Sequence, residues 1–439
     1  MKKILLSFFV FLFTSCSIQA NEIDKYIKAS GFEFKSTVSI LAKNDKKTIY
    51  KRNSQKLLNP ASILKVLTFG ASYNILGGDY RFETSLYKDS QNNYYVKLGA
   101  DPLLSSRNLV DLFSQIKNCK INNIYIDDSI IDKTQYPDSW MQEDTYPNQR
   151  AITPYITDNN YTEIAIKRSS LATNVDIIQN DSYKVPIINQ LKLGTKQDYK
   201  IDRLYGEDSS ILGFSGTIAK DVLLQLPVLK PEINFEIKLN EAINKAGIKY
   251  FNKISRKCLP NGAIKVTTIS HGIDEISRNI LLNSDNFTSE VVFKVAAAKY
   301  INYTHPATLN DALEMFSEFY QNEWIEGVKI VDASGVSRYN LVNSDFIVNC
   351  LEKLFQNENY KNLLATANQG TLKDRLIFLE NNLRAKTGTL SNMSSIAGTL
   401  TSKKNKNITF AIIVQNSPKR KGVLKNFENN IITVFYRKN

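Results

Sequence analysis

The spacing of apolar and polar residues predicts two strands and one buried helix near the start of the chain. Residues 34–43 and 48–52 alternate as strands do, and Asn44-Asp45 would join them. The run over residues 62–76 is apolar at most positions, and Gly77-Gly78-Asp79 ends it. Because a helix without a polar stripe cannot leave one face in water, this helix is predicted to be buried.

A second type of pattern fills the middle of the chain. From about Phe82 onward, short alternating runs and turns replace long helical stretches, and few long helices are predicted before residue 230. Predicted strands include residues 94–98, 123–126 and 161–166. We therefore expect residues 86–254 to form a β-rich inserted domain, or two such domains.

The last part of the chain is helical and then strongly alternating. Four helices are predicted, and they are followed by three antiparallel strands and a closing helix. Residues 21–85 and 255–439 are thus expected to combine into one α+β domain, an antiparallel sheet covered by helices. The helices are expected at 273–283, 288–300, 309–323 and 344–356, the strands at 383–387, 395–402 and 408–415, and the closing helix at 423–436.

The first twenty residues have the pattern of an export signal. Two lysines precede an apolar run over residues 4–13, and small and polar residues then lead to Ala20. The apolar run is too short to span a bilayer permanently. We predict a signal peptide over residues 1–20 and an exported mature protein, with a lipid anchor at Cys16 as the alternative.

The chain is basic, with 56 lysines and arginines against 43 acidic residues and a formal net charge of +13. The charges are dispersed, and no nucleic-acid-binding motif accompanies them, so nucleic acid is not an expected partner. Solubility is their main predicted role. Attraction to anionic polymers or lipid headgroups, and with it peripheral membrane association, is the alternative.

The mature chain keeps Cys119, Cys258 and Cys350, which are widely spaced and contain no Cys-x-x-Cys. This spacing predicts neither a metal site nor a dense disulfide framework, and it leaves one bridge open without indicating which. No metal and no cofactor are expected.

Candidate chemistry begins with Ser62 and Lys65, which stand three positions apart at the start of the buried helix. Residues at this spacing share a helix face, so the hydroxyl and the amine can meet. Apolar surroundings favour a neutral amine, and a neutral lysine beside a hydroxyl is a general base beside a nucleophile. Ser114 and Lys117 repeat the spacing on an amphipathic helix predicted over residues 108–120, so the pair alone decides nothing.

Two further motifs follow in order. Ser284-Asp285-Asn286 lies between two predicted helices, and Lys386-Thr387-Gly388 lies on the first strand of the last three. Ser-x-x-Lys, Ser-Asp-Asn and Lys-Thr-Gly in this order are similar to the three signatures of penicillin-binding proteins and serine β-lactamases.

Acyl transfer needs a nucleophile, a base and donors for the developing oxyanion. Ser62 is the predicted nucleophile and Lys65 the predicted base. Ser284 is predicted to relay a proton towards the leaving amine. Asn286 would hold Lys65 and the substrate amide.

The third motif supplies the predicted substrate-binding groups. Lys386 would add a second positive charge that favours a neutral base and attracts a substrate carboxylate. Thr387 would bond that carboxylate, and Gly388 would leave room for the substrate backbone. The backbone N–H groups of Ser62 and Thr389 are the expected oxyanion hole.

Competing chemistries have little support in the sequence. His271 and His305 are the two histidines, and neither Gly-x-Ser-x-Gly nor His-Glu-x-x-His occurs. Many β-lactamases carry a deacylating glutamate after Ser-Asp-Asn. The Glu-x-x-Leu-Asn run at residues 236–240 precedes that motif here and reads as structural, so a penicilloyl-enzyme is expected to persist.

The whole mature chain resembles the low-molecular-mass class C penicillin-binding proteins, the D-alanyl-D-alanine carboxypeptidase/endopeptidases of peptidase family S13. Residues 98–104, 332–340, 369–372 and 385–398 look like segments of that family, and the long interval from the first to the second motif is similar. Ala333 replaces a usual glycine, and Ala100 stands where glycine is common.

The resemblance implies a penicillin-binding and β-lactamase-like transpeptidase fold and a periplasmic location. It also implies stem peptides of peptidoglycan ending in D-Ala-D-Ala as substrates, and β-lactams as covalent inhibitors. Arg338 would lie near the cleft and shape substrate binding, with a salt bridge that supports its loop as the alternative.

We therefore predict a serine D-Ala-D-Ala carboxypeptidase that also cleaves D,D cross-links. A serine β-lactamase is the first alternative, and a non-catalytic binder of cell-wall peptides is the second.

Overall fold

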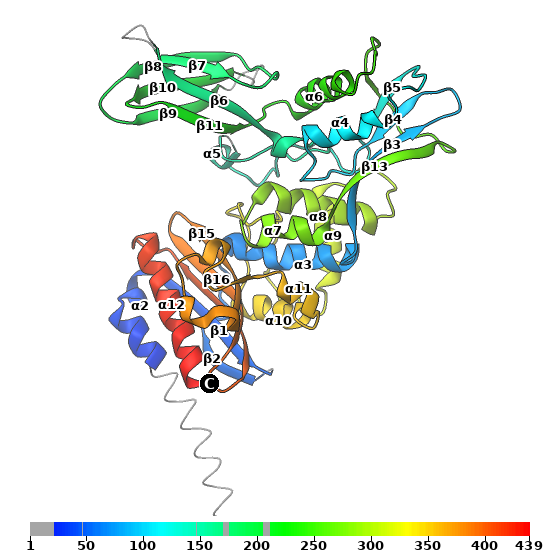
Figure 1. Cartoon of the computed structure of the whole chain (residues 1–439). Coiled ribbons are helices and arrows are strands. Elements are labelled where there is room, and N and C mark those ends of the chain that lie inside the picture. The colour runs from blue at the N-terminus through cyan, green and yellow to red at the C-terminus, as the bar shows by residue number, and fades with distance from the viewer. Residues whose placement is uncertain (1–21, 46, 146, 170–174, 205–210) are drawn as a thin grey trace, which may run out of the picture. The chain divides into compact units, whose positions relative to one another are not determined.

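The computed structural model describes residues 22–439 except 46, 146, 170–174 and 205–210 (Figure 1). The predicted signal peptide and Cys16 lie outside the described residues. The chain forms two compact units. The first contains residues up to 78, 277–293 and 312–439, and the second contains 79–276 and 294–311. The domain boundaries predicted from the sequence, at 85/86 and 254/255, stay a prediction.

The first unit is built on a six-stranded sheet in the order β14-β15-β16-β17-β1-β2. Strand β1 runs antiparallel to β17 from the Thr37–Gln415 pair to the Asn44–Ile408 pair. The two ends of the chain therefore meet in one sheet, as the alternating patterns predict (Figure 1). The strands are β1 (Thr37–Asn44), β2 (Lys47–Arg52), β14 (Ala365–Thr366), β15 (Leu383–Leu390), β16 (Met393–Thr401) and β17 (Asn407–Gln415).

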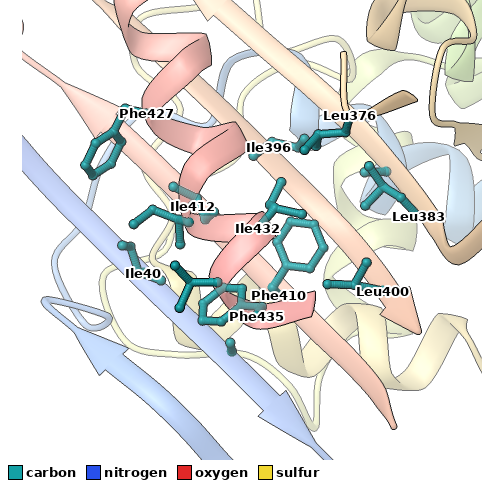
Figure 2. Close-up of a cluster of buried hydrophobic side chains, with 14 of the residues drawn as sticks. Ile40, Leu376, Leu383, Ile396, Leu400, Phe410, Ile412, Phe427, Ile432 and Phe435 are labelled. Carbon is teal, nitrogen blue, oxygen red and sulfur yellow. The ribbon is translucent and has the colours of Figure 1, made fainter. Parts of the chain in front are cut away.

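Strand alternation directs one set of side chains to each face of this sheet. On one face, Ile40, Phe410 and Ile412 pack against Ile432 and Phe435 of the closing helix α12, Lys421–Lys438 (Figure 2). On the other face, Ser39 of β1 bonds Ser344 at the start of α10 over 2.7 Å. Helices thus cover both faces, and the expected α+β class is confirmed.

The predicted helix over residues 62–76 is present and buried on nearly all sides. It begins as a single 3₁₀ turn, Ala61–Ile63, and continues as α3, Leu64–Leu76. The remaining helices of the C-terminal half are α7 (Ile273–Leu281), α8 (Asn286–Tyr300), α9 (Leu309–Phe319), α10 (Ser344–Leu354) and α11 (Glu358–Asn362). Among the residues that the structure describes, no helix has the length and apolarity needed to span a bilayer.

Several predictions were wrong at element ends, and the helix predicted over residues 309–323 ends at Phe319. The strand predicted from residue 34 starts at Thr37, because residues 32–35 form the short helix α2 after a left-handed turn at Gly31. Phe32 of that helix packs against Phe427, with ring centroids 4.6 Å apart. The helix predicted over 108–120 is α4, Ser106–Ser114, and ends early because turns follow it, with the N–H of Ile116 bonded to the Phe113 carbonyl.

The second unit contains a five-stranded sheet in the order β12-β5-β4-β3-β13 and two three-stranded sheets, β8-β10-β9 and β11-β6-β7. Helices α4 and α6 (Pro231–Lys245) supply apolar side chains to the core of the larger sheet. Its strands are β3 (Arg81–Lys88), β4 (Tyr94–Lys97), β5 (Ile124–Asp127), β12 (Ser255–Arg256) and β13 (Ile264–Gly272). The others are β6 (Tyr161–Arg168), β7 (Val175–Gln179), β8 (Ile187–Leu193), β9 (Asp198–Leu204), β10 (Ile211–Ile218) and β11 (Val222–Pro227).

Of the cysteines in the described part of the chain, Cys119 and Cys258 are exposed, Cys350 is buried, and all are free thiols.

Candidate active site

The turn before α3 presents Ser62 at the surface of the first unit. Ser62 is partly exposed, whereas Lys65, one helical turn further on, has no exposed surface. The side-chain oxygen of Asn59 accepts from the backbone N–H of Ala61 over 2.8 Å, and its amide donates to the Ser337 carbonyl over 2.9 Å. These bonds fix the turn that carries the hydroxyl.

The amine of Lys65 has three hydrogen-bond partners. Its Nζ lies 2.8 Å from Ser62 Oγ, 2.7 Å from Asn286 Oδ1 and 2.6 Å from the Ser334 carbonyl. The last two partners are oxygens that only accept, so they take the two N–H bonds of a neutral amine. Its lone pair is then left for the Ser62 hydroxyl, which is the arrangement a general base needs.

Burial decides the protonation of this amine. Removal from water lowers the pKa of Lys65 to about 8, although the charges of Asp332, Glu290 and Asp285 act in the opposite direction. At pH 7 about a tenth of the amine is therefore neutral, far more than for a lysine in water. The base predicted from the motif lies in the environment that this role requires.

Ser284 and Lys386 form a second hydroxyl–amine pair. The amine of Lys386 donates to Ser284 Oγ over 2.7 Å, and Ser284 adopts a left-handed backbone with φ of 60°. Such a conformation costs a non-glycine residue about 1 kcal/mol or more, so tertiary contacts must hold it. Burial lowers the pKa of Lys386 well below the usual lysine value, and the charge of Lys65 lowers it further. A substrate carboxylate would counter both effects, because an anion favours the ammonium form.

Strand β15 carries the third motif and passes directly beside the nucleophile turn. Thr387 and Gly388 are buried and Thr389 is partly exposed. A Cβ atom at Gly388 would lie 2.9 Å from the nitrogen of Ser62 and 3.0 Å from the oxygen of Pro60. The sequence predicts that Gly388 leaves room for substrate. In the structure, its missing side chain leaves room for the Ser395 hydroxyl and for the backbone of the nucleophile turn.

Residues 332–340 form a tightly bonded loop against the same turn. The carboxylate of Asp332 accepts from the N–H groups of Gly335 and Ser337 over 2.9 and 2.6 Å. Gly335 has φ of 76°, and a Cβ there would overlap the carbonyl oxygen of Ala61. The loop that carries the Ser334 carbonyl is therefore fixed relative to Ser62.

Ala333 and Ala100, which stand where the family commonly has glycine, differ in backbone strain. Ala333 is fully buried and does not have a positive φ, so its backbone needs no glycine. Ala100, in the second unit, has φ of 48°, a left-handed conformation that is unfavourable for alanine.

Sequence reasoning missed Glu290. This residue lies one helical turn after Asn286 on α8 and is 1% exposed. Its carboxylate accepts from the backbone N–H groups of Ala333 and Ser334 over 2.9 to 3.1 Å. The i to i+4 spacing from the second motif is a signal that could have identified it.

Arg338 is exposed and follows Ser337 in the same loop. Its predicted place at the substrate cleft stays a prediction.

The residues that the alternative mechanisms would use, two histidines and Glu236, lie in the second unit. His271 Nδ1 lies 2.6 Å from Asp101, and the half-exposed His305 lies 3.2 Å from Asp311. Glu236, from the Glu-x-x-Leu-Asn run, pairs with Arg256. Within the described ranges, no group of three or more His, Cys, Asp or Glu residues could hold a metal ion.

Comparison with known proteins gives a family match along nearly the whole chain. The sequence model of the D-Ala-D-Ala carboxypeptidase 3 (S13) family matches residues 19–437. The D-alanyl-D-alanine carboxypeptidase DacB of Haemophilus influenzae is 23% identical over 441 residues, which are 92% of this chain and 91% of the relative.

Solved structures agree with this match. The crystal structure of penicillin-binding protein 4 from Haemophilus influenzae superposes with a TM-score of 0.83 at 21% identity, covering 94% of this chain and 99% of that one. The same protein in complex with a β-lactam gives a TM-score of 0.79 at 21% identity, with the same coverage. This likeness establishes a shared fold, the one that the three motifs predict.

Proposed function

The chain belongs to the D-Ala-D-Ala carboxypeptidase 3 (S13) family, and from this premise we propose how its own residues perform the reaction. It is a serine-type D-Ala-D-Ala carboxypeptidase that binds penicillin. One observation carries the assignment of the nucleophile and the base: Lys65 Nζ lies 2.8 Å from Ser62 Oγ, with two other acceptors for its remaining N–H bonds.

In the acylation step, Ser62 Oγ attacks the carbonyl carbon of the penultimate D-alanine, and Lys65 takes the hydroxyl proton. The N–H groups of Ser62 and Thr389 stabilise the oxyanion of the tetrahedral intermediate. When the C–N bond breaks, the proton that Lys65 took from Ser62 passes through Ser284 to the leaving amine, so Lys65 is neutral again for the next step. D-alanine leaves, and the stem peptide remains as an ester on Ser62.

Water completes the cycle by attacking the ester carbonyl. Lys65 is the base that takes a proton from this water, and Ser62 recovers its hydrogen as the ester bond breaks. The same steps cleave a D,D cross-link when the leaving amine belongs to a neighbouring stem, so endopeptidase activity needs no further catalytic group.

We propose that strand β15 and the loop over residues 332–340 recognise the substrate. Lys386 and Thr387 would bind the terminal carboxylate of the stem peptide, and Arg338 would contribute from its loop. Asn286 would bond the peptide amide as well as Lys65. Each of these roles uses a side chain that carries the required donor or acceptor.

A persistent penicilloyl-enzyme is favoured over β-lactamase activity. Glu290 is a glutamate whose charge acts on the base, and both of its oxygens accept from backbone N–H groups. A carboxylate that is buried and bonded in this way has no route to a deacylating water.

The natural partners follow from this chemistry: stem peptides ending in D-Ala-D-Ala, with β-lactams as covalent inhibitors. Export to the periplasm is proposed from the N-terminal pattern. Peripheral membrane association is proposed from the net charge of +13 alone.

The test uses the mature protein and its Ser62→Ala variant. Each is incubated with a fluorescent penicillin, and then with a D-Ala-D-Ala pentapeptide. We expect a stable adduct on Ser62, release of D-alanine, and neither with the variant. Rapid loss of the adduct would indicate a β-lactamase, and no adduct on the wild type would exclude both enzymes in favour of a non-catalytic binder.

A further inference from the structure

Glu290 is a buried acidic residue to which the mechanism above gives no part. Building on that mechanism, we propose that Glu290 is a positioning residue: its carboxylate holds the Ala333–Ser334 backbone so that the Ser334 carbonyl binds Lys65. Its negative charge acts on the amine of Lys65 through the same short connection.

The geometry is a closed ring of contacts. Asn286 and Glu290 lie one turn apart on the same face of α8. Asn286 bonds Lys65 directly over 2.7 Å. Glu290 reaches it indirectly, since its carboxylate accepts from the N–H of Ser334 over 2.9 Å, and the carbonyl of that residue accepts from Lys65 over 2.6 Å.

A second helix holds the same turn from another direction. Thr68, three positions after Lys65 on α3, donates to the Ala333 carbonyl over 2.7 Å. The peptide between Ala333 and Ser334 is thereby held by α3 and by α8. Because Lys65 needs two fixed acceptors to direct its lone pair at Ser62, a shift of this peptide would misdirect the base.

Burial explains why Glu290 acts by positioning. It is 1% exposed, and both oxygens are bound to the backbone. It therefore cannot touch substrate or water. Its Oε1 alone accepts from both N–H groups, over 3.0 and 2.9 Å, so a glutamine could keep both bonds without the charge.

The electrostatic effect has a definite sign. Burial and the charge of Asp332 raise the pKa of Glu290 to about 7, so it is mostly ionised when Lys65 titrates near 8. The ionised carboxylate stabilises the ammonium form of Lys65. The charged groups that share this environment are Asp332 from the loop, Asp285 before α8, Lys65 from α3 and Lys386 from β15.

The experiment measures the second-order rate of Ser62 acylation by a fluorescent penicillin from about pH 5.5 to 10 for three full-length variants. Glu290→Gln keeps an acceptor and removes the charge. In its profile of acylation rate against pH, we expect the rise on the acidic side (the acid limb) to move to lower pH by about one unit. The rate at the optimum should fall little. Glu290→Asp keeps the charge and shortens the arm. Its rate should fall roughly tenfold to a hundredfold, with the acid limb unmoved.

Glu428→Gln is the matched control, because Glu428 is a fully buried glutamate on α12 that pairs with Arg375 over 2.8 Å. It should keep the wild-type acid limb. Wild-type rates and limbs in both Glu290 variants would contradict the role of Glu290, and so would an equal shift in the control. If neither Glu290 variant folds, Thr68→Val takes their place: it must lower the rate without moving the limb. Absence of an adduct on wild-type Ser62 would instead refute the proposed function.

Discussion

The Ser-x-x-Lys spacing of Ser62 and Lys65 recurs at Ser114 and Lys117 with opposite surroundings. In the first unit, Lys65 is fully buried on α3 and bonds Ser62 Oγ over 2.8 Å. In the second unit, Ser114 is the last residue of α4, and both it and Lys117 are exposed. The hydroxyl of Ser114 donates to the carbonyl of Val110, in its own helix, over 2.8 Å.

The difference shows that spacing makes a contact available and that burial gives it chemistry. A solvated lysine remains an ammonium ion at neutral pH, and an ammonium ion cannot accept a proton. At Lys65, burial favours the neutral form, and Asn286 and Ser334 leave one direction open for the lone pair. Neither condition is visible in the letters of the motif.

Replacing each lysine tests this contrast most strongly. Lys65→Met should lower the rate of Ser62 acylation by about a thousandfold or more, because general-base catalysis contributes about 10²–10⁴-fold. Lys117→Met should acylate at the wild-type rate. The measurement is the labelling rate with fluorescent penicillin at pH 8, and a similar loss in both variants would contradict the assignment.

The burial of Lys65 should also appear in stability. Its pKa falls from 10.5 to about 8 on folding, so the unfolded chain binds more protons between these values. Stability should therefore rise from about pH 8 to about 10.5, by about 3 kcal/mol from this group.

Urea unfolding of the wild type and Lys65→Met across this range measures the effect as a difference, which cancels the shared titration of tyrosines. The wild type should gain stability relative to the variant as the pH rises. Equal slopes would mean that Lys65 is not buried as an amine.

The Ser62–Lys65 pair also differs from the Ser114–Lys117 pair because β15 passes close to the turn that carries Ser62. Gly388→Ala would place a Cβ 2.9 Å from the Ser62 nitrogen, and the turn must move. We expect acylation to slow by roughly tenfold to a hundredfold, as displacements of about 1 Å at a reacting group do. Gly422→Ala is the control, since a Cβ there meets nothing within 4 Å. Equal rates in both variants would contradict the tight approach.

The smallest effect is expected at the second pair. Ser114→Ala removes an exposed hydroxyl that bonds only within its helix, so the free energy of unfolding should change by less than about 0.5 kcal/mol. Thermal unfolding and penicillin labelling should both match the wild type. A clear loss of labelling would give the second pair a part in catalysis.

Much of the fold was predictable because it follows from local periodicity. The buried run over residues 62–76 and the alternating strands near both ends appear at the predicted positions. The errors at residues 34–36 and 115–120 lie at element ends, where a few backbone contacts decide. Examples are the left-handed conformation of Gly31 before α2 and the hydrogen-bonded turns after α4.

The sequence by itself determined the class of chemistry, because three short motifs in one order specify a hydroxyl, two amines and an amide on known elements. The tertiary structure alone decided which groups hold the base in place. Ser334 lies 269 positions from Lys65 along the chain and bonds it directly. Glu290 lies on another helix and reaches Lys65 through the Ser334 backbone. Such bonds depend on how helices and loops pack together, and residue spacing along the chain carries no record of that packing.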